Sequence, residues 1–209
     1  VDVLFRDPQR AFKEMLADGM IPPDKIDLYR KDPALLERII IACVNNKEIE
    51  DDGLVFDVNS VHAQPIREVE LYSGVRVKLK AHLGRAEISL QLDVGTGDAV
   101  TPDSELIEYP SLLEDMPTAK LRAYRFETAI AEKLHAAVEL ETANSRMKDF
   151  FDLWWLSLHR EYDGTVLTDA VVATFERRGT ALPVGLPVAF TELFYGRPDK
   201  QTQWSGFLR

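Results

Sequence analysis

A strict alternation of apolar and polar residues over two adjacent segments constrains this fold more than any other feature. Residues 75–83 and 86–94 each carry an apolar side chain at every second position, which is typical of a half-buried β-strand. Gly84-Arg85 between them suits a two-residue type II′ turn, so the pattern predicts an antiparallel hairpin. The turn also fixes the register. The predicted cross-strand pairs are Leu83 with Ala86, Lys80 with Ser89, Lys78 with Gln91, and Arg76 with Asp93.

This register divides the hairpin into an apolar face and a charged face. The apolar face is predicted to be core and carries Val77, Leu79, Leu90 and Leu92. The other face sets basic residues against acidic and polar ones, namely Arg76, Lys78, Lys80 and His82 against Asp93, Gln91, Ser89 and Glu87. Such a face is either a solvated surface of paired charges or a surface that handles phosphates. We expect His82 to pair with Glu87.

The segments before the hairpin predict further strands and helices. Asp7-Pro8 and Asp32-Pro33 each combine an N-cap aspartate with a proline at the first helical position. The second of these helices has one apolar face, made of Leu35, Leu36, Ile39 and Ile40. Strands are expected at residues 1–5, 26–29, around 54–58 and at 66–71.

Beyond Thr101-Pro102 the pattern becomes helical. Helices are predicted over residues 126–140, roughly 146–159, about 168–178, where Gly179 ends the helix, and 200–208. Aromatic residues in the second of these helices are expected in the core and in helix packing, namely Phe150, Phe151, Trp154 and Trp155. No linker rich in glycine and serine divides the chain. An α+β fold is therefore predicted, with a sheet region, residues 1–116, and a helical region, residues 117–209, packed on it.

Composition argues against several classes of protein. No apolar run approaches the roughly 18 residues of a membrane-spanning helix, and no signal segment is recognisable. The single cysteine, Cys43, excludes an internal disulfide framework. A net charge of −10 argues against generic DNA binding, which usually needs a basic stripe. These features predict a cytoplasmic protein without membrane attachment.

Several segments resemble motifs of the AbiEii/AbiGii toxin family, in the family's order. They are the acidic turn and strand at 51–57, the strand and Gly-rich loop at 90–102, an E-x4-E-K helix at 126–134, a K-D-x-x-D-L motif at 145–153, and the tail around 177–179 and 200–204. The resemblance covers roughly residues 26–209. It implies a polymerase-β-like nucleotidyltransferase fold, with a mixed sheet and an appended C-terminal helical region. It also implies a bacterial toxin of a toxin–antitoxin or abortive-infection system, neutralised by a cognate antitoxin.

The chemistry implied by the resemblance is metal-dependent transfer of a nucleotide from an NTP to an RNA acceptor such as tRNA. Charge builds on the leaving pyrophosphate, and Mg²⁺ held by carboxylates neutralises it. Asp93 is the implied catalytic metal ligand. Lys133 is the implied catalytic lysine that meets phosphate, and the other candidates for nucleotide binding are Glu132, Lys78 and Arg76.

The K-D-x-x-D-L motif supplies two further candidate catalytic residues, Asp149 and Asp152. They are three residues apart and therefore share one helix face. By the resemblance, Asp149 supports the site or positions the acceptor hydroxyl. The alternative is that Lys133 with Glu132, and Lys148 with Asp152, form ordinary ion pairs on helix surfaces.

The family's first motif, a Gly-Gly or Gly-Ser turn followed by an R-x-T-x-D-x-D strand, is not intact in this sequence. Judged by distance from residues 51–53, Asp27 takes the second aspartate position, with Lys25 where the first would stand. Judged by strand character, Asp2 takes it, and its companion would precede Val1. Both stay open as metal ligands. The incomplete motif also leaves open a catalytically degenerate protein that binds nucleotide or antitoxin without turnover.

Overall fold

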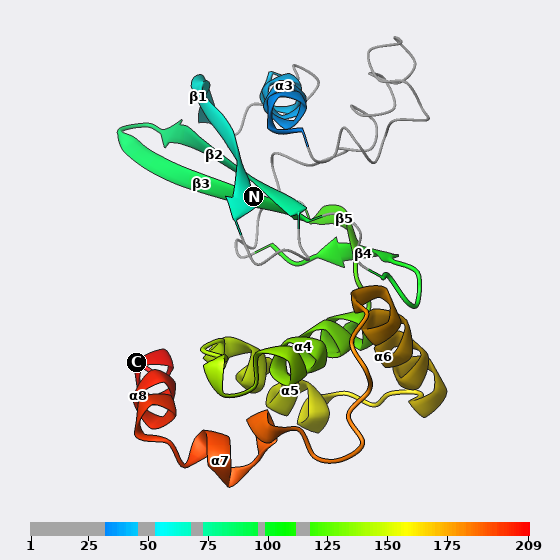
Figure 1. Ribbon diagram of the computed structural model, residues 1–209. Helices are drawn as coiled ribbons and strands as arrows, with labels where there is room; N and C mark the ends of the chain where they lie inside the picture. The colour runs from blue at the N-terminus through cyan, green and yellow to red at the C-terminus, as the bar shows by residue number, and fades with distance from the viewer. Residues whose placement is uncertain (1–31, 46–52, 68–72, 96–98, 112–117) are drawn as a thin grey trace. The chain divides into compact units, whose positions relative to one another are not determined.

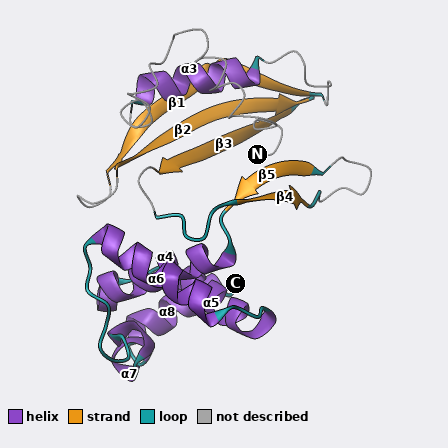
Figure 2. Cartoon of the chain, turned by 90° about the vertical axis from the view of Figure 1, so that its right-hand side faces the viewer, coloured by secondary structure: helices purple, strands orange, loops and turns teal. Residues whose placement is uncertain are grey.

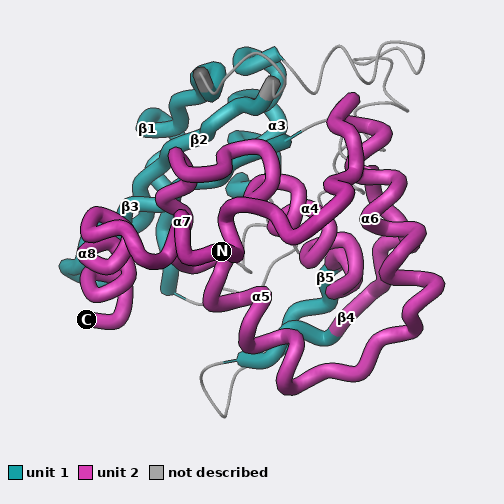
Figure 3. Tube along the Cα trace, turned by 60° about the horizontal axis from the view of Figure 1, so that its bottom comes forward, with its two compact units in different colours: residues 1–97, 108–121 teal, residues 98–107, 122–209 magenta. Residues whose placement is uncertain are grey.

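The computed structural model describes residues 32–45, 53–67, 73–95, 99–111 and 118–209. The chain forms two compact units, one of residues 1–97 and 108–121 and one of residues 98–107 and 122–209 (Figure 3). The elements predicted at residues 1–5, 7–19 and 26–29 lie outside the described residues. The predicted α+β class is confirmed by an antiparallel sheet followed by a helical region.

Strands β1 (Leu54–Arg67), β2 (Ser73–Leu83) and β3 (Ala86–Gly95) form an antiparallel sheet in that order. The predicted hairpin is confirmed as β2 and β3, and every predicted pair is found, including Arg76 with Asp93 and Lys78 with Gln91. Gly84 has a φ of +58°, which the first position of a type II′ turn requires. Turn chemistry and alternation therefore agree on one register.

Strand β1 is a single strand where two were predicted. Residues 66 and 67 continue β1, so the separate strand expected from residue 66 is wrong at its start, and its remainder lies outside the described residues. Pro65 is tolerated inside β1 because the strand lies at the edge of the described sheet. The register shifts between Asp57 and His62, where the Ser60 hydroxyl donates to the Asp57 carbonyl and accepts from the Lys80 amide.

Helix α3 (Pro33–Val44) covers one face of this sheet (Figure 2). The Asp32 carboxylate accepts from the Ala34 amide, as an N-cap does. The predicted apolar face is buried, and it packs on the apolar face of the hairpin. The shared core contains Leu35, Leu36, Ile39, Ile40, Cys43, Ala63, Val75, Val77 and Leu79. The charged face of the hairpin is consequently the one turned away from this core.

A two-stranded sheet, β4 (Glu105–Tyr109) and β5 (Ala119–Ala123), was not predicted from the sequence. Each strand has five residues, which is too short for alternation to be distinctive. Across the pair of strands, Lys120 Nζ lies 3.7 Å from Glu108 Oε1. The boundary between the two compact units falls within both strands.

The helical region contains α4 (Phe126–Leu140), α5 (Met147–His159) and α6 (Gly164–Arg178), followed by the short α7 (Glu192–Tyr195) and α8 (Pro198–Phe207) (Figure 1). The helices predicted at 126–140 and 146–159 are confirmed. Helix α6 begins four residues before the prediction, because the Asp163 carboxylate accepts from the Thr165 and Val166 amides. It ends as expected at Gly179, with φ +64°. No helix in the described ranges has both the length and the apolar character needed to cross a membrane.

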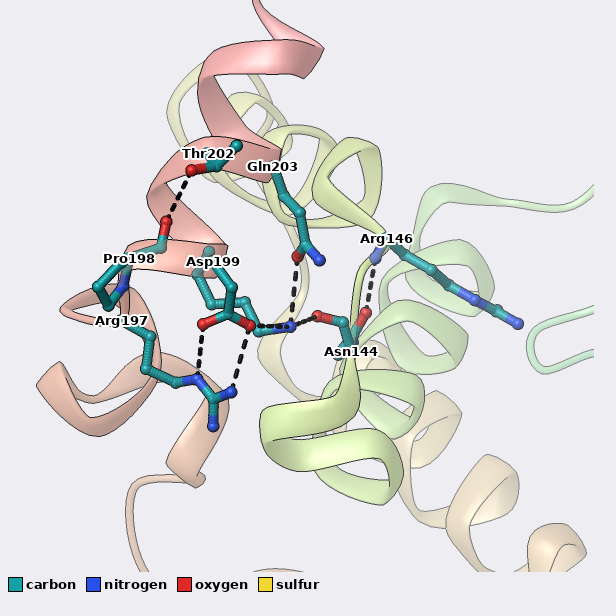
Figure 4. A network of polar contacts seen from close by, with 8 residues as sticks. Asn144, Arg146, Arg197, Pro198, Asp199, Thr202 and Gln203 are labelled. Carbon is teal, nitrogen blue, oxygen red and sulfur yellow. Dashed lines mark hydrogen bonds and ion pairs between the residues drawn. The ribbon is translucent and has the colours of Figure 1, made fainter.

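A buried lysine ties the C-terminal helix to the turn before α5. The Lys200 ammonium donates to the Asn144 carbonyl at 2.7 Å and to Gln203 Oε1 at 3.3 Å, and only 4% of the lysine is exposed. Asn144 Oδ1 in turn accepts from the Arg146 amide (Figure 4). The buried ammonium is therefore hydrogen-bonded, as a charge in a protein interior must be.

The two tryptophans of α5 are exposed, although they were expected in the core. Trp154 is 55% exposed and Trp155 is 38% exposed, so their expected role in the core is wrong. Phe150 does pack, against Phe190 and Phe194. A helix covered on some sides only cannot bury aromatic residues at every position around its axis.

His135 predicts a pH dependence of stability. The ring is 2% exposed, contacts Phe175 edge-on and lies 2.9 Å from the Thr180 hydroxyl. Burial lowers the pKa of His135 below its usual 6.5, with Glu139 opposing part of the effect. The unfolded chain therefore takes up this proton first, and the free energy of unfolding falls as pH drops below about 6.5 and through the folded pKa.

This dependence is measured by urea unfolding at about pH 7.5 and about pH 5.5. The His135→Gln variant keeps a polar group near Thr180 and lacks the titrating proton, so its stability should change less over the same interval. Equal changes in both proteins would contradict the assignment.

Candidate functional site

Helices α4 and α5 bring together a lysine–aspartate cluster, made of Lys133, Asp149, Asp152 and Lys148. Lys133 Nζ lies 2.5 Å from Asp149 Oδ1 and 2.9 Å from Asp152 Oδ2. Lys148 Nζ lies 2.7 Å from the same Asp152 oxygen, one helical turn away. The spacing of three residues puts both aspartates on one face of α5. The packing of α4 on α5 then sets Lys133 between them.

The cluster is partly buried, and its groups stabilise one another's charge. The Lys133, Asp149 and Asp152 side chains are 21%, 21% and 23% exposed. Burial acts to lower the pKa of Lys133, but the hydrogen bonds to Asp149 and Asp152 outweigh it, and the pKa is raised. Burial acts to raise the pKa of Asp152, but the bonds from Lys148 and Lys133 outweigh it, and the pKa is lowered. Both groups are therefore charged throughout the neutral range.

This arrangement places a cation, the Lys133 ammonium, in contact with two carboxylates that can accept a proton. An ammonium has three N–H donors, and two are directed to Asp149 and Asp152. The third donor position suits a phosphate oxygen. A carboxylate held next to that position can accept a proton from a hydroxyl group. The cluster therefore has the components needed to bind a phosphate and activate a nucleophile.

The acidic residues of the E-x4-E-K motif lie on α4 with Lys133. Glu132 directly precedes Lys133, is half-buried, and has a buried Oε1. Glu127 is 6% exposed, with Oε1 3.5 Å from Arg125 Nη2. Adjacent helical residues point about 100° apart, so Glu132 and Lys133 face different directions around α4.

The charged face of the hairpin carries the other predicted site residues. Arg76 Nε and Nη2 donate to the two oxygens of Asp93 at 2.7 and 2.8 Å, and Gln91 Nε2 lies 3.4 Å from Asp93 Oδ2. The hydrogen bond from Arg76 lowers the pKa of Asp93, with burial opposing it. Lys78 is exposed on the same strand as Arg76. Asp93 is thus part of a bidentate ion pair.

Elsewhere on this face, Glu87 lies across the ladder from His82 as expected. Its carboxylate, however, accepts from the Lys80 ammonium at 2.9 Å. The diagonal lysine reaches that carboxylate because its side chain is long, and a diagonal neighbour lies within such reach.

The described residues alone do not fit a divalent metal at Asp93. Both carboxylate oxygens of Asp93 accept from Arg76, and Mg²⁺ demands several oxygen ligands in near-octahedral geometry. In the described parts of the chain, no group of three or more His, Cys, Asp or Glu residues is placed to hold a metal ion. The candidate ligands Asp2 and Asp27 lie outside the described residues.

Substitutions in the pair of Arg76 and Asp93 can show whether the pair serves only the stability of the fold or also the activity. Their side chains are 32% and 44% exposed, so Asp93→Asn should lower the free energy of unfolding by less than about 1 kcal/mol. If Asp93 also serves the reaction, the same variant loses activity far beyond this change. Urea unfolding and a nucleotide-transfer assay on Asp93→Asn and Arg76→Gln measure the two effects. Similar small changes in both assays for both variants would mark the pair as structural.

The structure brings Lys133, Asp149 and Asp152 together, while Asp93, Arg76 and Lys78 belong to the other compact unit. The ion pair of Lys148 with Asp152, which the sequence offered as the alternative, is present, and Asp152 also pairs with Lys133, so that it joins both lysines in one network. Lys148, Asp152, Trp155 and His159 are spaced three or four residues apart, which places them on one stripe of α5.

The structure sets Lys133, from the E-x4-E-K helix, between the two aspartates of the K-D-x-x-D-L helix, two segments on which the resemblance to the AbiEii/AbiGii family was based. The family model of the nucleotidyl transferase AbiEii toxin, of type IV toxin–antitoxin systems, matches residues 26–209, and the chain belongs to this family. The resemblance drawn from the motifs is confirmed. Comparison with curated proteins and with solved structures finds no match. Family membership implies a nucleotidyltransferase, an NTP substrate and, in general, an antitoxin partner.

Proposed function

We propose that this protein transfers a nucleotide from an NTP to an RNA acceptor such as tRNA, with the lysine–aspartate cluster as the part of the site that binds phosphate. The observation that carries the proposal is the position of Lys133 Nζ, 2.5 Å from Asp149 and 2.9 Å from Asp152. Lys133 and Asp149 are 16 positions apart in the chain, and their contact across two separate motifs supports a shared role. The proposal includes a polymerase-β-like arrangement of the sheet region, residues 1–116, with the helical region, residues 117–209, packed on it.

In this reaction an acceptor hydroxyl oxygen forms a bond to the α-phosphorus of the NTP. The bond from that phosphorus to the bridging oxygen breaks, and pyrophosphate leaves. Lys133 neutralises charge on the phosphate oxygens, which is worth most where the negative charge is growing. Asp149 accepts the proton of the acceptor hydroxyl, and Asp152 holds Lys133 in place between the two carboxylates.

Dependence on a divalent metal is part of the proposal as the family resemblance implies it. Its ligands would include Asp93 and either Asp2 or Asp27. Since the described residues alone do not fit a metal, the steps assigned above use only the protein's own side chains.

The experiment is incubation of the full chain with each labelled NTP, Mg²⁺ and total tRNA, followed by separation of the labelled RNA. Labelled tRNA that depends on one NTP and disappears on chelation supports the proposal. Absence of transfer with every NTP, together with no toxicity on expression, would overturn it.

Calorimetry with Mg-NTP distinguishes the second candidate, a nucleotidyltransferase-fold protein that binds without turnover. The departure of the first family motif from its usual pattern favours this alternative. Binding of Mg-NTP that is lost in Lys133→Ala, with no labelled product, would replace the enzyme by the binding protein. Absence of both binding and transfer would leave only the family's fold.

A further inference from the structure

We propose that Trp155 and His159 form a stacking platform for an unpaired base of a single-stranded RNA acceptor. This inference rests on the proposed function, because it places the acceptor next to the lysine–aspartate cluster. The two rings are parallel within 8°, with centroids 4.3 Å apart. His159 Nδ1 lies 2.8 Å from the Trp155 carbonyl oxygen, which holds the imidazole in this orientation. Trp155 is 38% exposed and His159 is exposed, so the pair is open to solvent.

The platform continues the stripe of α5 that begins in the cluster. Asp152 and Trp155 are three residues apart, and Trp155 and His159 are four apart, so the three side chains share one side of the helix. The rise of about 1.5 Å per residue puts Trp155 roughly 4.5 Å along the axis from Asp152. A nucleotide whose phosphate reaches Lys133 can therefore extend its own base, or that of its neighbour, to the Trp155 ring.

Cations on the same pair of helices fit a charged, single-stranded ligand. Arg160 Cζ lies 4.7 Å over the ring of Phe126, which is 42% exposed. Phe126 precedes Lys133 by seven residues and Arg160 follows Asp152 by eight, so the Arg160–Phe126 contact is about 10–12 Å along the helices from the cluster. That separation suits one or two nucleotides of an extended strand. In a protein of net charge −10, exposed aromatic rings next to an arginine match the needs of bases and phosphates.

The exposed Trp155–His159 pair and the Arg160 guanidinium, which follows directly after α5, together favour RNA over an apolar protein partner. An apolar protein surface covering this end of the two helices would remove the Arg160 guanidinium from water without supplying a charge partner, which is unfavourable. A single strand supplies phosphate for the cation and an open base face for the ring. The internal base pairs of a duplex have both faces covered by their neighbours, so a duplex offers the platform far fewer open base faces than a single strand does.

The test compares Trp155→Leu with Trp155→Phe and with the control Trp154→Leu. Trp154 is 55% exposed on the same helix and contacts Phe151, away from the His159 ring. The probe is a fluorescently labelled eight-nucleotide single-stranded RNA, offered alone and as a blunt duplex, with Kd read by anisotropy. We expect Trp155→Leu to raise the Kd for the single strand about tenfold, Trp155→Phe to recover most of it, and Trp154→Leu to leave it unchanged.

Equal affinity of Trp155→Leu and the unsubstituted chain would overturn the platform, as would duplex binding as tight as that of the single strand. A Kd for NTP that rises in Trp155→Leu while RNA binding stays unchanged would also overturn it, because the base would then be that of the nucleotide substrate. Binding needs no turnover. RNA affinity that depends on Trp155, in a chain that shows no transfer, therefore upholds the platform and rejects the transferase. Transfer by Trp155→Leu with the same KM for RNA as the unsubstituted chain upholds the transferase and rejects the platform.

Discussion

Lys133→Ala is expected to lower nucleotide transfer by about 100-fold to 1,000-fold, the usual cost of removing one preorganised donor to a developing oxyanion. The variant removes the cation and leaves Asp149 and Asp152 facing each other without their shared partner. Repulsion between these carboxylates also lowers the free energy of unfolding, by about 1–3 kcal/mol for a pair that is neither fully exposed nor fully buried. Single-turnover transfer and thermal unfolding measure the two effects separately.

Two matched variants show which effect dominates. Lys148→Ala removes a lysine of the same cluster whose side chain is 72% exposed, so transfer should fall by less than about fivefold. The combined variant Lys133→Met, Asp149→Asn, Asp152→Asn removes the repulsion, so it should regain stability and stay inactive. Transfer by Lys133→Ala at the unsubstituted rate would reject Lys133 as a catalytic residue. Recovery of activity along with stability would show that the cluster is only structural.

Phe175→Ala is expected to destabilise the helical region by about 3–5 kcal/mol, because a large buried ring is replaced by a cavity. The Phe175 side chain is 1% exposed and meets the His135 ring edge-on, with centroids 5.0 Å apart. Urea unfolding followed by tryptophan fluorescence measures the change. All three tryptophans, Trp154, Trp155 and Trp204, belong to the same compact unit as Phe175, so the signal reports on that unit.

The control for this prediction is Leu193→Ala. Leu193 is 73% exposed on α7, so its truncation should change the free energy of unfolding by less than about 0.5 kcal/mol. A loss below about 1.5 kcal/mol in Phe175→Ala would mean that the surrounding helices close the cavity, and that the contact between α4 and α6 is more plastic than its burial suggests.

Local rules accounted for the elements whose formation depends on neighbours in the chain. The register of β2 and β3 follows from alternation and from the glycine of the turn, and the ends of α3 and α6 follow from Asp32 and Gly179. The same rules failed for β4 and β5, which are short and owe their existence to pairing with each other. They also divided β1 into two strands, whereas the structure continues it through Pro65, which is tolerated because the strand lies at the edge of the described sheet.

The sequence by itself determined the hairpin, most helix bounds, the family and the placement of Asp149 and Asp152 on one helix face. Only the tertiary structure decided that Lys133 lies between those aspartates and that Arg76 hydrogen-bonds to the Asp93 carboxylate. It also decided that Trp155 is open to solvent while Phe150 is packed. The physical reason is range. Caps, turns and periodicity act over a few residues, whereas an ion pair across 16 positions or the burial of one aromatic ring among several depends on which surfaces meet.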